Sequence, residues 1–327
     1  MTLSTIRSRL PSPRTLLAGA ALAVFGHGAA LAATPLPSHL PSSCGKAPSG
    51  ELSAQRIAAV TPSRSEPGLY EGPVWIKDAL YFSDFSFSQG FPSRVRKLTL
   101  DGKVTTAIED AGSNGLAVDK DGKLVAATHN TKSLSRYDLS NGKRSDIAAR
   151  YQGNVFNSPN DIAIAPDGTI YFTDPDFQQA AAPGGQPVTG IYRVGVDGKV
   201  TLVDGSRRNP NGIALSLDGA QLYVVAGDGA IRSYDVKGKM PQAGRELVKG
   251  IDTGDGMTLD CHGNLYATEH GARRVRVFSP QGRELATIKV DANVTNVAFG
   301  GKDGKTLYIT GAGAVWQTRL DVSGLPY

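Results

Sequence analysis

Cysteine, long hydrophobic runs and clustered basic residues are all scarce in this 327-residue chain. Cys44 and Cys261 are the only cysteines, so at most one intrachain disulfide can form. The apolar run at residues 16–25 is too short and too rich in small residues to span a bilayer, so we expect no stable membrane association. No run of lysine and arginine interleaves with aromatic residues, which argues against nucleic-acid binding.

The N-terminus has the pattern of a cleaved export signal. Arg7, Arg9 and Arg14 precede the apolar run, and Ala30-Leu31-Ala32 offers a small-residue cleavage site. We therefore expect residues 1–32 to be a signal peptide and the protein to be exported, either periplasmic or secreted. There is no adjacent arginine pair, so the twin-arginine route is not indicated. Loss of this segment lowers the formal charge from +5 to about +2.

Residues 33–50 are rich in proline and serine and are predicted to be a flexible lead-in. Cys44 lies in this segment. An oxidising compartment permits a disulfide between Cys44 and Cys261, which would attach the lead-in to the fifth repeat described next. The alternative is two unpaired thiols, because spacing alone does not show proximity.

A short phrase occurs six times along the chain, each time opened by a polar residue that we call an anchor. Successive anchors are 41 to 51 residues apart, and the phrases are Glu71-Gly-Pro-Val-Trp, Asn114-Gly-Leu-Ala-Val, Asn160-Asp-Ile-Ala-Ile, Asn211-Gly-Ile-Ala-Leu, Asp255-Gly-Met-Thr-Leu and Asn296-Val-Ala-Phe. Each phrase leads into a turn and a second apolar run. This period and strand–turn–strand pattern predict an all-β fold, a six-bladed β-propeller over residues 51–327.

Equivalent positions in a ring of blades surround the axis, so the anchors should meet at one mouth of the central channel. Residues that directly follow each second strand should return to the same face; these candidates are Asp84, His129, Asp174, Asp228, Glu269 and His270. The third repeat has an insertion at residues 177–189 that could cover the mouth as a lid. We expect the ring to close by pairing a strand near residues 55–60 with the last strand, at residues 314–320.

The anchors bring two carboxylates, Glu71 and Asp255, to one axis together with the amides of Asn160 and Asn211. Two facing carboxylates repel each other, and a bound divalent cation removes that repulsion. All-oxygen ligands favour Ca²⁺, with Mg²⁺ or Mn²⁺ as alternatives, over a structural zinc ion. Protein groups would fill only part of the coordination sphere, which leaves room for water and substrate, as metal-assisted hydrolysis requires.

Other interpretations apply to individual anchors. Asn-Gly and Asp-Gly at strand starts are common in turns, which would account for Asn114 or Asn296 alone. Glu71 is a poor turn residue and therefore points more strongly to a ligand. Asp161 would either orient Asn160 or cap the start of a strand. His129 and His270 are expected to form hydrogen bonds at the rim rather than to bind metal.

These motifs resemble the SMP-30/gluconolactonase/LRE-like family of six-bladed propellers, which includes regucalcin. The resemblance covers about residues 55–320, and all six blocks occur in order. Besides the anchor phrases, it is carried by Asn157-Ser-Pro-Asn-Asp, Tyr171-Phe-Thr-Asp-Pro, Phe299-Gly-Gly and Leu307-Tyr-Ile-Thr.

The resemblance implies hydrolysis of a small-molecule sugar lactone to the aldonic acid. It also implies one divalent metal ion, with Ca²⁺ expected and Zn²⁺, Mn²⁺ or Mg²⁺ as alternatives. Glu71, Asn211 and Asp255 would hold the metal, with Asn160 as a ligand or substrate contact. The metal would polarise the lactone carbonyl and Asp255 would activate water.

The substrate-binding positions implied in this way are Asn114, Asn160, Asp161, His129 and His270. Many gluconolactonase-like sequences have Glu-His after the second strand of the second blade, where this chain has Thr128-His129. This departure concerns the rim of the pocket rather than the metal ligands.

Two other functions are compatible with the sequence. One is a metal-dependent hydrolase of another ester, similar to arylesterases or phosphotriesterases. The other is a non-catalytic interaction propeller, because residues 256–278 also resemble an NHL repeat. Such a propeller has no need for Glu71, Asn211 and Asp255 together. The sequence carries no signal for an oligomeric state.

Overall fold

The computed structural model describes residues 44–62, 64–236 and 244–325, all within one compact unit. The expected signal peptide and residues 33–43 of the expected lead-in lie outside the described residues. In these ranges the only helical element is a 3-10 turn, η1 (Gln179–Ala181), and the other regular elements are β-strands. No helix in the described part of the chain is long and apolar enough to cross a membrane.

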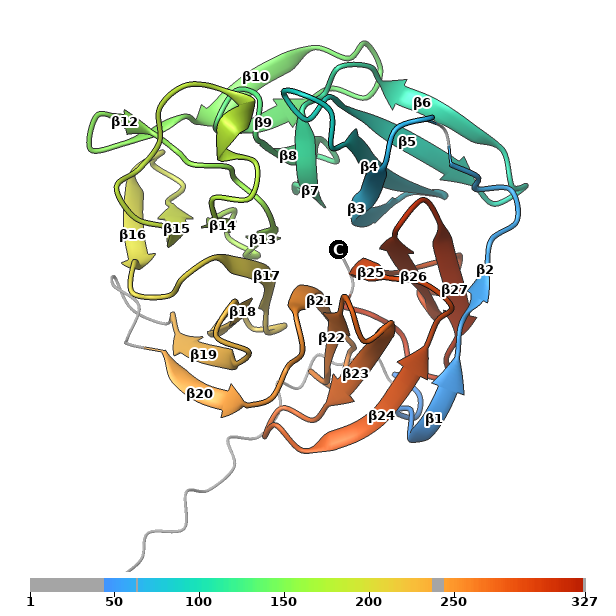
Figure 1. The fold of residues 1–327 in the computed structure, drawn as a ribbon. Coiled ribbons are helices and arrows are strands. Elements are labelled where there is room, and N and C mark those ends of the chain that lie inside the picture. The colour runs from blue at the N-terminus through green and yellow to red at the C-terminus, as the bar shows by residue number, and fades with distance from the viewer. Residues whose placement is uncertain (1–43, 63, 237–243, 326–327) are drawn as a thin grey trace, which may run out of the picture. The chain divides into compact units, whose positions relative to one another are not determined.

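Six antiparallel sheets radiate from a central axis, which confirms the six-bladed β-propeller (Figure 1). The inner strands are β3 (Gly68–Ile76), β7 (Ser113–Val118), β13 (Ile162–Ile164), β17 (Pro210–Leu215), β21 (Gly254–Leu259) and β25 (Val294–Gly300). The second strands are β4 (Ala79–Ser86), β8 (Leu124–Thr128), β14 (Ile170–Asp174), β18 (Gln221–Ala226), β22 (Leu265–Glu269) and β26 (Thr306–Gly311).

The outer strands complete the blades. The third strands are β5 (Ser93–Thr99), β9 (Ser133–Tyr137), β15 (Gly190–Val194), β19 (Ile231–Asp235), β23 (Arg274–Phe278) and β27 (Val315–Arg319). The fourth strands of the first five blades are β6 (Val104–Ile108), β10 (Arg144–Ala148), β16 (Val200–Asp204), β20 (Arg245–Val248) and β24 (Glu284–Lys289). A small hairpin, β11 (Arg150–Tyr151) and β12 (Asn154–Val155), lies between the second and third blades in sequence.

The hydrophobic core lies between neighbouring blades. Second strands are in the middle of their sheets and are covered on both sides, so every residue of β4, β8 and β14 is buried. Between the first and last blades, the rings of Trp75 and Tyr308 stack with their centroids 5.5 Å apart. This burial of apolar and aromatic side chains is the main favourable contribution to holding the blades together.

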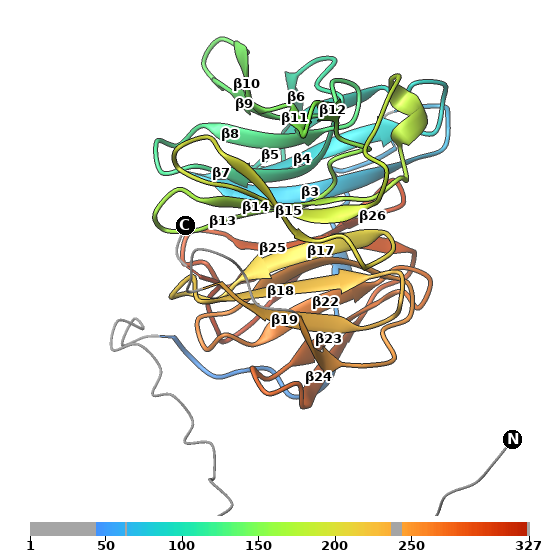
Figure 2. The same cartoon turned by 90° about the vertical axis from the view of Figure 1, so that its left-hand side faces the viewer.

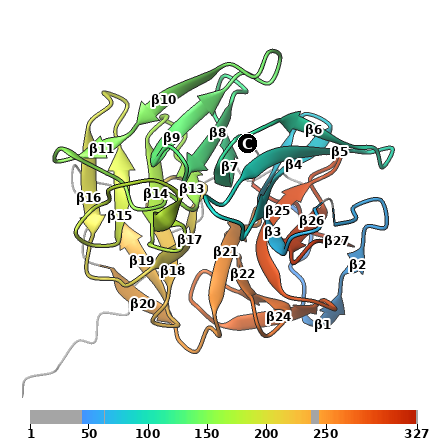
Figure 3. The ribbon, with the colours of Figure 1, turned by 45° about the horizontal axis from the view of Figure 1, so that its top comes forward.

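The N-terminal segment closes the ring, as the sequence predicts. β2 (Gln55–Arg56) pairs antiparallel with β27 and so becomes the fourth strand of the sixth blade. β1 (Gly50–Ser53) adds to the fifth blade by parallel pairing with β24, and Figure 3 shows both strands at the outer edge. Cys44 and Cys261 form a disulfide, the first of the two alternatives that the sequence left open. The segment therefore joins the fifth and sixth blades.

Four of the six anchors lie inside β-bulges of the inner strands, in β7, β17, β21 and β25, where the pairing register with the second strand shifts across the anchor. In β3 the register shifts just after the anchor, between Glu71 and Val74, and Asn160 lies before the start of β13. A bulge bends the strand and redirects the side chain that it contains. The repeated bulge is therefore the local reason why these polar side chains face the axis.

The glycine after an anchor is required by the neighbouring blade. A Cβ atom on Gly115 would lie 2.2 Å from the carbonyl oxygen of Asn160, and one on Gly212 would lie 2.1 Å from that of Asp255. At both positions only glycine permits this close approach. The Asn-Gly pairs thus serve contacts between blades rather than the turns that their composition suggests.

Candidate functional site

A cavity of about 690 Å³ lies on the face of the ring that carries η1, the right-hand face in Figure 2. Five of the six anchors line it: Glu71, Asn114, Asn160, Asn211 and Asp255. They come from five different blades, as the repeat predicts. The sixth anchor, Asn296, lines a second cavity and uses its Oδ1 to accept a hydrogen bond from the backbone N–H of Val297, at 2.8 Å.

The two carboxyl groups in the first cavity are difficult to ionise. Burial raises the pKa of Glu71 well above its usual value, and the nearby charges of Asp255 and Asp161 raise it further. The pKa of Asp255 is also raised well above its usual value, first by burial and then by Asp161. A cation between them would stabilise both charges.

Two amide oxygens beside these carboxyls have no hydrogen-bond partner. They are Oδ1 of Asn211 and Oδ1 of Asn114, and both are buried. Buried oxygens without partners are uncommon in native proteins and call for a ligand, an ion or water. Two carboxylates and neutral amide oxygens are the donor set that a hard divalent cation prefers, so the residues present fit such an ion.

Within the described ranges, no three or more His, Cys, Asp or Glu side chains are grouped so that they could hold a metal ion. The fit described above therefore depends on the asparagine oxygens as well as on Glu71 and Asp255. The ligand set expected from the sequence, with two carboxylates and two amides, stays a prediction.

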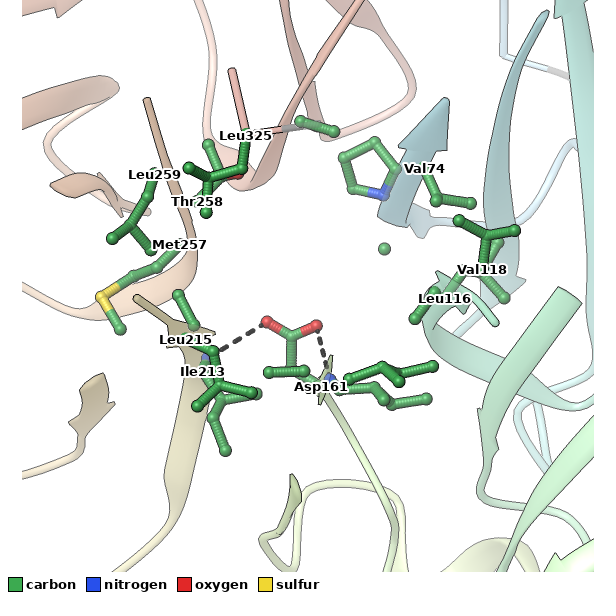
Figure 4. Close-up of a pocket in the computed structure, with 18 of the residues that line it drawn as sticks. Val74, Leu116, Val118, Asp161, Ile213, Leu215, Met257, Thr258, Leu259 and Leu325 are labelled. Carbon is green, nitrogen blue, oxygen red and sulfur yellow. Dashed lines mark hydrogen bonds between the residues drawn. The ribbon is translucent and has the colours of Figure 1, made fainter. Parts of the chain in front are cut away.

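Asp161 does not line the first cavity. It belongs to the second cavity, of about 300 Å³, which is lined mainly by apolar residues such as Leu116, Ile213 and Met257. Figure 4 shows its carboxyl group between backbone N–H donors of Ile162 and Ile213, at 3.0 and 3.4 Å. Burial raises the pKa of Asp161 to about 7. The structure thus places Asp161 within electrostatic reach of Glu71 and Asp255 but outside their cavity.

The two candidate histidines occupy different environments. His270 lines the first cavity, with its Nδ1 3.8 Å from Oδ2 of Asp255 and 2.7 Å from the carbonyl oxygen of Val294. His129 is fully buried and does not line the cavity. Its Nε2–H donates to the carbonyl oxygen of Phe91 at 2.7 Å, and burial lowers its pKa to about 4.

Most other residues that follow the second strands form structural contacts. The carboxylate of Asp84 pairs with three arginines, Arg64, Arg94 and Arg96, at 2.9 to 3.4 Å. Asp228 pairs with the buried Arg207, and Glu269 pairs with Arg274 and Arg276. Of the six candidates, only His270 lines the first cavity.

Asp174 fixes the loop that carries Asn160. Its two carboxylate oxygens accept hydrogen bonds from the backbone N–H groups of Asn157 and Ser158, at 2.9 and 2.8 Å. Burial raises the pKa of Asp174 to about 7, an effect that these two donors oppose. Asp174 therefore positions an anchor without entering the cavity.

The insertion at residues 177–189 contributes Phe177 and Gln178 to the cavity. Gln178 accepts a hydrogen bond from the side-chain amide of Asn114, at 3.4 Å. Several polar contacts hold the insertion to the third blade, including those of Asn157 with Gln186 and Val188. It forms a fixed wall of the cavity in this structure.

Sequence reasoning missed the apolar part of the cavity wall, which consists of Leu69, Phe85, Phe87, Phe91, Phe177 and Ile251, and also Arg208. A signal was present, because Phe85 lies at the end of the second strand of the first blade and Phe87 and Phe91 follow it, much as His270 follows the second strand of the fifth. The loop phenylalanines lie beyond the one or two positions directly after the strand, so the repeat pattern did not single them out.

A model of the SMP-30/gluconolactonase/LRE-like region matches residues 69–313. The chain belongs to this family. Among its relatives is a gluconolactonase from Zymomonas mobilis, which is 31% identical over 287 residues, spanning 78% of this chain and 79% of that protein.

Two solved structures have the same architecture. A gluconolactonase from Xanthomonas campestris has a TM-score of 0.71 at 26% identity, covering 84% of this chain and 98% of that one. A regucalcin from Agrobacterium tumefaciens, described as a calcium-binding protein, has a TM-score of 0.68 at 21% identity, with coverage of 85% and 97%. At that identity the second likeness shows the fold alone.

Proposed function

We propose that this chain is a lactonase-type hydrolase that uses one divalent cation, with Ca²⁺ expected, to open a sugar lactone to its aldonic acid. The observation that carries the proposal is the pair of carboxyls with raised pKa values, Glu71 and Asp255, beside a buried amide oxygen of Asn211 that lacks a partner. Membership of a family with named gluconolactonases supports the substrate class.

Glu71, Asn160, Asn211 and Asp255 would hold the cation. When bound, a divalent cation supplies Lewis-acid polarisation of an ester carbonyl and offsets the repulsion between carboxylates. Asn160 and Asn114 line the same cavity and would orient the hydroxyl groups of the sugar ring. The neighbouring Gln178 limits the movement of Asn114 through their hydrogen bond.

Asp255 is the residue proposed to act as the base. Its side chain is 14% exposed and lines the cavity, so water can reach it. In its ionised form it takes a proton from the water that attacks the lactone carbonyl, and it returns that proton to the ring oxygen as the ester bond breaks. The side-chain hydrogen bond from Asn211 favours this ionised form, because it lowers the pKa of Asp255.

His270 lies beside Asp255, with its Nδ1 3.8 Å from Oδ2 of that residue. With Nδ1–H donating to the carbonyl oxygen of Val294, its Nε2 is left to accept from the side-chain amide of Asn293, at 3.3 Å. Both ring nitrogens therefore have hydrogen-bond partners. This arrangement suits a hydrogen-bonding residue at the rim, the role expected from the sequence.

We also propose that the protein is exported. The N-terminal pattern motivates this proposal, and the disulfide between Cys44 and Cys261 is compatible with an oxidising compartment.

The test follows acid release from D-glucono-1,5-lactone by protein from residue 33 onward. The protein is first stripped with a chelator and then given Ca²⁺, Mn²⁺, Mg²⁺ or Zn²⁺ in turn. We expect turnover to be lost on stripping and recovered with a metal. Full turnover in the stripped protein would remove the metal from the proposal, and metal binding without any turnover would point to another ester.

The variant Asp255→Asn tests the base. It should lower kcat/KM by about 10²–10⁴-fold while circular dichroism stays unchanged, because the amide cannot accept the proton from water. Asp121→Asn, an exposed aspartate outside the cavity, is the matched control and should retain wild-type activity. Activity of Asp255→Asn within a few-fold of wild type would contradict the assignment.

A further inference from the structure

The wall of the first cavity contains four phenylalanines. Phe85, Phe87 and Phe91 come from the end of β4 and the loop after it, and Phe177 comes from the insertion in the third blade. Phe87 and Phe177 are 52% and 44% exposed and are among the few large hydrophobic residues of the described chain with so much exposed surface. These rings add an apolar surface to a cavity whose other side carries the polar anchors.

The loop of the first blade is built to present these rings. Phe91 has a φ of 50°, a conformation that a bulky residue rarely adopts. It is held by two hydrogen bonds, one from its N–H to the carbonyl oxygen of Ser88 at 2.9 Å and one from His129 to its own carbonyl oxygen. The strained backbone is thus supported by a buried side chain of the next blade.

His129 also packs between two of the rings. Its centroid is 6.0 Å from that of Phe85 and 6.2 Å from that of Phe91, in edge-on geometry, and the Phe85 ring is 5.8 Å from Phe87. His129 therefore positions the phenylalanines rather than contacting substrate. This explains why a polar residue at this position is fully buried.

The backbone next to Phe177 is held by contacts from the second and third blades. The backbone N–H of its neighbour Gln178 donates to the hydroxyl oxygen of Ser158 at 3.2 Å, and the Gln178 side chain meets Asn114. The buried ammonium group of Lys132 donates to the carbonyl oxygens of Asn157 and Gln179, at 2.7 and 2.8 Å. Phe177 thus lies directly beside the anchor ring.

We propose that Phe85, Phe87, Phe91 and Phe177 form a subsite for an apolar substituent on the lactone, an alkyl chain or an aryl group. The reacting ester would lie over the anchors, and the substituent would cover the exposed faces of Phe87 and Phe177. This inference rests on the proposed lactonase function and names its substrate class more closely.

Chain length supplies a direct measure of this subsite. Burying one methylene group contributes about 0.8 kcal/mol, which corresponds to roughly a fourfold gain in kcat/KM or affinity. δ-Valerolactone and δ-nonalactone share the same ring and ester and differ only in a butyl chain. We expect kcat/KM for δ-nonalactone to be at least tenfold higher.

The variants Phe87→Ala and Phe177→Ala should each lower the ratio of the two kcat/KM values by about fivefold or more. Leu100→Ala is the control, because Leu100 is 48% exposed and lies outside the cavity, and it should leave the ratio unchanged. Equal kcat/KM for the two lactones, or a ratio that neither phenylalanine variant alters, would overturn the subsite.

A binding experiment separates the subsite from catalysis. δ-Valerolactam and its 6-butyl derivative resist hydrolysis, so calorimetric titration measures affinity in the absence of turnover. Tighter binding of the butyl lactam, lost in Phe177→Ala, would support the subsite even if no lactone is hydrolysed, in which case only the proposed function fails. Equal affinity for the two lactams in the wild-type protein would overturn the subsite.

Discussion

The histidine His129 shows how a single buried residue can link the fold of one blade to the surface of another. Burial lowers its pKa to about 4 and so favours the neutral form, whose Nε2–H donates to the carbonyl oxygen of Phe91. An unfolded chain has the ordinary histidine pKa of 6.5 and takes up a proton at higher pH. The contribution of neutral His129 to the unfolding free energy is therefore fully present above pH 6.5 and is lost as the pH falls toward about 4.

This difference predicts a pH effect on unfolding. Between pH 7 and pH 5 the wild-type protein should lose about 2 kcal/mol more unfolding free energy than the variant His129→Gln, whose amide does not titrate. Denaturant titrations at both pH values measure it. If the two proteins lose stability equally over this interval, His129 does not titrate as its burial implies.

The anchors that line the first cavity could be identified from the sequence. Which cavity an adjacent residue lines could not. Asn160 and Asp161 are adjacent, yet they line different cavities. The repeat does not reveal this difference, because it depends on the local path of the backbone: in four other blades a bulge redirects the anchor, whereas here the inner strand β13 starts only at Ile162. The phenylalanine wall was missed because it depends on the path of a loop.

At the scale of elements, the insertion of the third blade depends on one buried asparagine. Oδ1 of Asn157 accepts hydrogen bonds from Gln186 N–H at 3.0 Å and from the Gln179 side chain at 2.8 Å, and its Nδ2 donates to Val188. An insertion predicted as a lid is thus tied at several points along its length. Its contacts are side-chain hydrogen bonds between distant residues, which the sequence pattern does not reveal.

Replacing this residue should loosen the insertion. Asn157→Ala leaves buried donors and an acceptor without partners, so we expect a loss of about 1–3 kcal/mol of unfolding free energy. Amide hydrogen exchange across residues 177–189 should also accelerate, and Asn154→Ala, at an exposed position nearby, is the control. Unchanged exchange in Asn157→Ala would mean that the other contacts suffice to hold the insertion.

At the scale of the whole molecule, the ring of blades could be predicted from the 41- to 51-residue period. Each repeat supplies one blade, and the inner strands of the blades surround one axis. Closure by β2 was also predictable, because a strand is needed to complete the last blade. The disulfide was not, since Cys44 and Cys261 are 217 residues apart and only the closed ring brings their Cα atoms to 5.8 Å.

Removing this cross-link should destabilise the ring without affecting catalysis. The double variant Cys44→Ser/Cys261→Ser is expected to lose about 2–5 kcal/mol of unfolding free energy. Its kcat/KM should be unchanged, because neither cysteine lines the first cavity. A reductant should shift the melting temperature of the wild-type protein but not that of the variant, and equal stability of the two oxidised proteins would contradict the prediction.

The position of Cys44, β1 and β2 also sets an order of events in synthesis. A chain grows from its N-terminus, so Cys44, β1 and β2 emerge before the inner strand of every blade, while their partners in the fifth and sixth blades are made last. The first four blades are complete in sequence before Cys44 and β2 have a partner. A change in this segment should therefore affect the final step of maturation rather than its beginning.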